Sequence, residues 1–157
     1  MKRRAFIGFA GWIMANLPFA LLAQQGGSKK RIGVLIARPE NDAEGQSYIV
    51  AFEQALEPLG WRPGLNIEID YRWTAGNAQL AETFAKELVA LKPDILVINS
   101  TASVIAARRT AGTIPIVMAA VADPVAQGFV RSLERPGGNI TGFAVEEPEM
   151  EQSGSNC

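Results

Sequence analysis

Three short polar segments each follow an apolar run that is typical of a buried strand. They cover residues 38–46, 99–103 and 122–124. In open parallel sheets, ligands collect beyond the carboxyl ends of the strands, where loops meet helix N-termini. These segments therefore form the candidate ligand-binding region. Its candidate residues are Arg38, Gln46, Ser100, Thr101, Ala102, Ala122 and Asp123.

Four of these polar residues have two interpretations each. Ser100 and Thr101 stand where the N-cap and first turn of a helix should be. Their hydroxyls and the free backbone N–H groups could hold a ligand carboxylate, or they could serve only as a helix cap. Asp123 either caps the next helix or pairs with a ligand ammonium group. Arg38 either pairs with an anionic group or is solvated.

The residue types argue against catalysis and against a metal site. Histidine is absent and Cys157 is the only cysteine, which excludes His-based triads, histidine metal sites and paired-cysteine mechanisms. No dinucleotide-binding, phosphate-loop or nucleophile-elbow motif occurs. We therefore predict no catalytic residue, no cofactor and no metal. A small exported hydrolase that uses Ser100 or Ser103 remains as the enzyme alternative.

The elements that must position these residues alternate between strand and helix. Apolar runs predict strands over residues 31–37, 66–73, 95–98, 114–121 and 139–143. Helical spacing of apolar residues predicts helices over residues 43–59, 77–91, 102–109 and 125–133. This alternation requires parallel crossovers and predicts an α/β fold, a doubly wound parallel sheet covered on both faces. The alternating run over residues 66–73 indicates a strand nearer an edge, where Trp61, Tyr71 and Trp73 either pack or stack on a ligand ring.

The first 23 residues have the layout of a secretory signal peptide. Lys2, Arg3 and Arg4 form a basic head, and an apolar run without acidic residues continues to Ala23. Residues 3–7 also resemble a twin-arginine signal, so both export routes remain open. Cleavage after Ala23 would remove three basic residues and shift the formal net charge from −1 to −4. That charge argues against nucleic-acid binding, and we expect no stable membrane insertion after cleavage.

The remainder divides into three parts. Residues 24–30 form a linker, and residues 31–145 form one globular domain, which suits a chain of 157 residues. Residues 146–157 are acidic and then rich in Ser, Gly and Asn, so we expect a disordered tail.

Several blocks of residues together resemble a known family. They are RIGVL at 31–35, LGW at 59–61, IDYRW at 69–73, LVALKPD at 88–94, IPIV at 114–117, VADPV at 121–125 and RPGGNITGF at 135–143. In this order they are similar to the ABC transporter substrate-binding proteins related to tryptophan and tyrosine transport components. The resemblance implies the first lobe of a type I periplasmic-binding-protein fold (flavodoxin-like or Rossmann-like). It further implies a periplasmic protein that captures a small organic solute, such as an amino acid, between two hinged lobes and passes it to an ABC transporter permease.

The end of the sequence departs from that family. The family continues after residues 141–143 into a second lobe, whereas this sequence ends at Cys157. The resemblance therefore implies a truncated chain that carries one wall of the cleft. One wall buries little of an amino-acid-sized ligand, so we expect weak or no binding by this chain alone. An exported ligand-sensing domain with a receptor partner is the alternative function.

Overall fold

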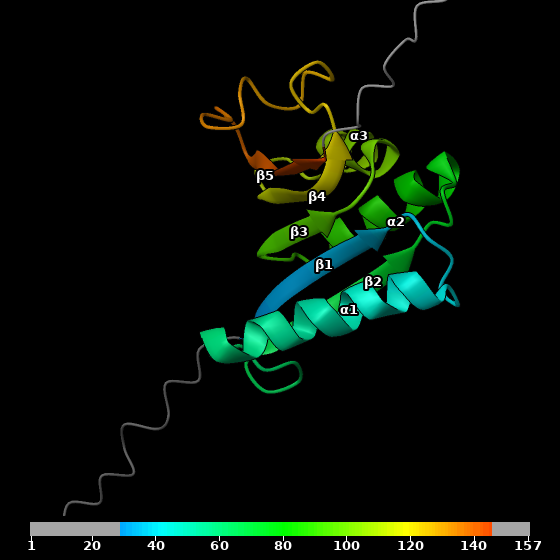
Figure 1. Cartoon of the computed structure of the whole chain (residues 1–157), viewed down its shortest axis with the longest axis vertical. Coiled ribbons are helices and arrows are strands. Elements are labelled where there is room, and N and C mark those ends of the chain that lie inside the picture. The colour runs from blue at the N-terminus through cyan, green and yellow to red at the C-terminus, as the bar shows by residue number, and fades with distance from the viewer. Residues whose placement is uncertain (1–28, 146–157) are drawn as a thin grey trace, which may run out of the picture.

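The computed structural model describes residues 29–145, which form a five-stranded sheet with helices on both sides (Figure 1). All strand pairs are parallel and the strand order is β2-β1-β3-β4-β5. The strands are β1 (Lys30–Ile36), β2 (Ile67–Trp73), β3 (Ile95–Ile98), β4 (Ile116–Ala122) and β5 (Ile140–Val145). The helices are α1 (Ala43–Leu56), extended by a 3-10 turn over Glu57–Leu59, α2 (Ala78–Ala90) and α3 (Thr101–Thr110).

This architecture confirms the predicted doubly wound α/β sheet. The strand with the alternating pattern, β2, is an edge strand, as its sequence indicated. Trp61, Tyr71 and Trp73 pack against the apolar cluster under α1, which confirms their packing role. The predicted signal peptide (residues 1–23) and the predicted disordered tail (146–157) lie outside the described residues.

Local side-chain chemistry fixes where the helices begin. The Asp42 carboxylate accepts a hydrogen bond from the Gly45 N–H at 2.7 Å and so caps α1. The Asn77 side chain accepts from the N–H groups of Gln79 and Leu80 and caps α2. Each cap holds a helix start directly beyond the end of a strand. The caps therefore fix where α1 and α2 begin after β1 and β2.

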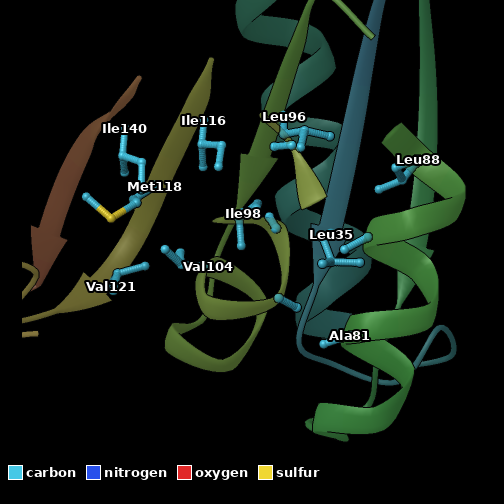
Figure 2. Close-up of a cluster of buried hydrophobic side chains, with 14 of the residues drawn as sticks. Leu35, Ala81, Leu88, Leu96, Ile98, Val104, Ile116, Met118, Val121 and Ile140 are labelled. Carbon is cyan, nitrogen blue, oxygen red and sulfur yellow. The ribbon is translucent and has the colours of Figure 1, made fainter. Parts of the chain in front are cut away.

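Two apolar layers hold the helices on the sheet. α2 and α3 cover one face, where the larger core cluster is built around Leu35, Leu88, Leu96 and Met118 (Figure 2). α1 covers the other face, where Ile49 and Phe52 pack on a smaller cluster from β1 and β2. Figure 1 shows α1 lying in front of β1 and β2, and Ile95 and Val97 of β3 also pack against the cluster under it. Within residues 29–145, helices therefore lie on both faces of the sheet, as expected.

The predicted helix over residues 125–133 is wrong. The chain there makes one turn, in which the Gln127 N–H donates to the Asp123 carbonyl at 3.0 Å and the Phe129 N–H to the Pro124 carbonyl at 2.9 Å. Gly128 then adopts a left-handed conformation with φ of +68°. A residue in that region ends a helix, so the apolar spacing beyond it does not continue the turn.

Candidate ligand-binding site

The carboxyl ends of all five strands lie along one edge of the sheet, called here the carboxyl edge. At this edge the strand order reverses between β1 and β3, because the chain leaves β1 toward β2 on one side and later runs through β3 to β4 on the other. Loops on the two sides of such a switch point diverge and leave a crevice that ligands occupy in open α/β sheets. The side-chain oxygen of Asn99 bridges it, accepting from the Ala37 N–H at 2.8 Å.

Arg38 follows β1 at the switch point, and its charge is already paired within the loop. Its guanidinium lies 2.7 Å from the Glu44 carboxylate and 3.3 Å from that of Asp42, and 5.7 Å from the centre of the Tyr48 ring. Desolvation lowers the pKa of Arg38, but the two carboxylates outweigh it and raise the pKa overall. Arg38 thus joins the loop to the start of α1, a role that its sequence position did not indicate.

Ser100 and Thr101 stand at the start of α3, beyond the end of β3. The Ser100 hydroxyl accepts from the Ser103 N–H at 3.3 Å and donates to the Ser103 hydroxyl at 2.8 Å. The capping interpretation of Ser100 is therefore confirmed. Thr101 and Ala102 form the first turn of α3 and are half-buried. Their backbone N–H groups point along the helix axis toward the carboxyl edge.

The end of β4 carries two residues in strained conformations. Ala120 has φ of +61° at an irregularity in the pairing of β4 with β5, and Asp123 has φ of +38°. The Asp123 carboxylate accepts from the Ala126 N–H at 3.0 Å, so it caps a turn rather than the predicted helix. Ala122 is the last residue of β4. Sparsely populated conformations of this kind concentrate at functional sites.

The candidate residues share one edge but not one pocket. Ser100 follows the end of β3 by two residues, whereas Asp123 follows the end of β4, beyond the irregularity at Ala120. Gln46 lines a hollow of about 430 Å³ with Glu40 and Trp73, and its amide donates to the Glu40 carbonyl at 2.6 Å. Ser100, Thr101 and Asp123 line neither this hollow nor the second, apolar one at the switch point.

Sequence reasoning missed two polar side chains at the switch point. Asn99 begins the predicted ligand segment 99–103 but is not among the candidate residues, although a polar residue directly after the apolar run of β3 is an available signal. Tyr48 lies one turn into α1, where helical periodicity gave no reason to single it out. Both line the apolar hollow, which has a volume of about 370 Å³.

Residues 29–145 contain neither a metal-binding cluster nor a membrane-spanning helix. No cluster of three or more His, Cys, Asp and Glu side chains that could hold a metal occurs in this part of the chain. No helix within the same residues is long and apolar enough to cross a membrane.

Comparison with known proteins places this architecture in a family. The profile of the ABC transporter substrate binding protein family matches residues 34–154. A curated relative, the "Tyrosine-binding protein" of Clostridioides difficile, is 38% identical over 116 residues, which are 73% of this chain and 32% of the relative. The chain thus spans about a third of that relative's length.

Solved structures agree with this relationship. A ligand-free, open substrate-binding protein with adhesive properties from Clostridium difficile has a TM-score of 0.66 and 33% identity, over 73% of this chain and 38% of that one. A conserved domain protein from Vibrio cholerae has a TM-score of 0.66 and 32% identity, over 76% and 40%. An ABC domain from Streptococcus pneumoniae in complex with L-Trp has a TM-score of 0.63 and 29% identity, over 74% and 39%. The chain belongs to the ABC transporter substrate-binding protein family.

Proposed function

We propose that this chain supplies one wall of a solute-binding cleft at the carboxyl edge, and that the solute is a small amino-acid-like molecule passed to an ABC transporter permease. The observation that carries the proposal is the switch point between β1 and β3, where the loops that follow these two strands lead to the capped starts of α1 and α3. The protein acts by binding and not by catalysis. Its place of action is the periplasm, reached through the signal peptide proposed for residues 1–23.

The chemistry of the edge supports an amino-acid-like solute. Helix N-termini such as that of α3 favour a carboxylate, and the Asp123 carboxylate suits an ammonium group. Two relatives carry printed names or titles that mention tyrosine and L-Trp, which supports an aromatic amino acid as the first solute to test.

Binding by this chain alone should be weak because residues 29–145 enclose the solute from one side only. The region around Ser100 and Asp123 is an open surface that belongs to neither hollow. An open wall buries much less ligand surface than an enclosed pocket. We therefore propose a dissociation constant in the millimolar range.

A thermal-shift screen against amino acids and organic acids tests this proposal. A ligand at a concentration equal to its Kd stabilises the folded state by about 0.4 kcal/mol, which corresponds to a rise in Tm of about 1–2 °C for a domain of this size. We expect one compound class to give such a rise at about 1 mM. A rise above about 10 °C would show that one wall suffices for tight binding, and the absence of any rise at about 10 mM would contradict the solute proposal.

A matched pair of glutamines on α1 provides the control. Gln46 lies at the carboxyl edge and Gln54 is exposed two turns farther along the same helix. We expect Gln46→Ala to reduce the ligand-induced rise in Tm and Gln54→Ala to leave it unchanged. Equal effects of the two substitutions on the rise in Tm would show that Gln46 is not part of the ligand-binding site.

A further inference from the structure

Asn99 lies directly after β3 at the switch point, and one hydrogen bond fixes how its side-chain amide is turned. The amide oxygen accepts from the Ala37 N–H at 2.8 Å. Because a backbone N–H is a donor, the oxygen of the amide must face it and the nitrogen cannot. The NH2 group of Asn99 is therefore turned away from the Ala37 N–H.

The NH2 group of Asn99 is accessible to a ligand. Within residues 29–145 it has no hydrogen-bond acceptor, and the same residues contain no buried side-chain nitrogen or oxygen that lacks a partner. The amide nitrogen is thus reachable from outside and is not sealed in the core. A carboxamide NH2 has two N–H donors, and both are available here.

The pairing register places Asn99 at the entrance of the apolar hollow, which has a volume of about 370 Å³. In the pairing of β1, β3 and β4, Asn99 follows the last paired level and stands between Ile36 and Ala119. Val34 and Val97 line the hollow at the next level of the same face, nearer the middle of the sheet. A solute that arrives at the carboxyl edge therefore meets Asn99 first and these apolar side chains behind it.

The rest of the hollow offers no other available polar side chain among its lining residues. The other two polar side chains that line it are tyrosines, and both hydroxyls are engaged. Tyr48 donates to the Glu44 carboxylate, and Tyr71 donates to that of Glu53 at 2.8 Å. No charged side chain lines the hollow. Its volume exceeds the space of about 150 Å³ that holds a benzene ring in a protein interior, so an apolar or aromatic side chain fits it.

On the basis of the proposed function, we infer that the Asn99 amide binds the carboxylate of the solute and that the hollow receives the solute's side chain. A carboxylate only accepts hydrogen bonds, so it matches an NH2 group that only donates them. The start of α3 follows Asn99 directly and adds a partial positive charge at the same end of the hollow. The solute is then an amino acid with a large apolar side chain. A charged side chain is excluded because the hollow has no group to pair with it.

The side-chain NH2 signals of Asn99 in the NMR spectrum of the isotope-labelled full chain report this contact. We expect them to shift on titration with L-phenylalanine. They should stay unchanged with phenethylamine, which has the same ring and ammonium group but no carboxylate. The Asn99→Asp variant identifies these signals, because it lacks them. Equal shifts with the two compounds, or no shift with L-phenylalanine, would overturn the inference.

The Asn99→Asp variant also separates the donor from the link to the loop. An aspartate oxygen still accepts from the Ala37 N–H, so we expect the variant to be as stable as the unsubstituted chain. The NH2 group is replaced by a charged acceptor, so L-phenylalanine should bind at least about tenfold more weakly. Phenethylamine, a cation, should then bind more tightly than L-phenylalanine. A purely structural role for Asn99 would not reverse this preference.

Asn77→Asp is the matched control for the added charge. Asn77 also follows a strand at the carboxyl edge, and its side chain accepts from the N–H groups of Gln79 and Leu80, which an aspartate does equally well. It lines neither hollow. We expect Asn77→Asp to keep the preference for L-phenylalanine over phenethylamine. Reversal in both variants would show a general effect of charge and contradict the role of Asn99.

Failure of this inference is distinguishable from failure of the solute proposal. If Asn99→Asp lowers Tm, the titration of the NH2 signals in the unsubstituted chain decides the result. A response to amino acids in the loops of the carboxyl edge, without a shift of the Asn99 NH2 signals, would retain the solute site and reject this inference. No response to any amino acid would contradict both.

Discussion

Ser100 shows how one side chain at the carboxyl edge can serve both the fold and the site. Its hydroxyl caps α3 and also bonds to the Ser103 hydroxyl, which is fully buried. Truncation would leave the Ser103 N–H and hydroxyl without this partner. The same truncation would change the surface that faces the proposed solute.

We expect Ser100→Ala to lower the free energy of unfolding by about 1 kcal/mol, as is typical for loss of an N-cap. Urea denaturation measures this change. Ser47→Ala is the control, because the exposed Ser47 hydroxyl donates only to a carbonyl of its own helix, that of Glu44. A Ser100→Ala variant as stable as Ser47→Ala would show that the cap contributes nothing.

The chain has two tyrosines, Tyr48 and Tyr71, and the pKa of each phenol depends on its surroundings. Burial, then the hydrogen bond to the Glu53 carboxylate, raises the pKa of Tyr71 far above its usual value. The hydrogen bond to Glu44, then desolvation, raises the pKa of Tyr48. The folded state thus holds both phenol protons more tightly than the unfolded state, and this stabilisation is complete below about pH 10 and declines as pH rises further.

Absorbance of tyrosinate during an alkaline titration checks this prediction. The folded protein should show little tyrosinate at about pH 10, whereas urea-unfolded protein should be about half ionised there. Tyr71→Phe should remove the component with the higher pKa. Half-ionisation of the folded protein at about pH 10 would contradict the burial and hydrogen bonding described for Tyr71.

At the scale of elements, the pairing of β4 with β5 depends on one glycine. Gly142 has φ of +143°, and a Cβ added there would meet the backbone of Met118, with the Met118 nitrogen at 2.6 Å. Met118 is part of the larger core cluster, so the backbone cannot retreat without moving the core. The edge strand β5 is therefore held in place only while this position remains glycine.

We expect Gly142→Ala to destabilise the fold by about 3 kcal/mol, since it combines strain with a backbone clash. Gly138→Ala is the control, because a Cβ at Gly138 meets nothing within 4 Å and its φ is not left-handed. Chemical denaturation of both variants gives the comparison. Similar stabilities for the two variants would show that β5 can slip or detach without cost.

Most elements could be predicted from the sequence because their signals are local. Apolar periodicity located every strand and the first three helices, and the cap at Ser100 followed from its residue type and place. The failure over residues 125–133 came from Gly128, whose left-handed conformation ends the turn. The ion pairs of Arg38 with Asp42 and Glu44 could not be predicted, because they depend on how the loop after β1 folds back on the start of α1.

At the scale of the whole molecule, the proposed site lies at one edge of the domain formed by residues 29–145. The chain spans about a third of its curated relative and less than half of the similar solved chains. The carboxyl edge is one wall of the proposed cleft.

The most direct test of the proposed site is an amide NMR titration of the isotope-labelled chain with L-tyrosine and L-tryptophan at millimolar concentrations. Weak binding at the switch point predicts fast-exchange shift changes that concentrate in the three loops of the carboxyl edge, at residues 38–46, 99–103 and 120–124. Glycine amides at the opposite edge, such as Gly64 and Gly112, should not move. Shift changes confined to that opposite edge, or none for any amino acid, would contradict a solute site at the carboxyl ends of the strands.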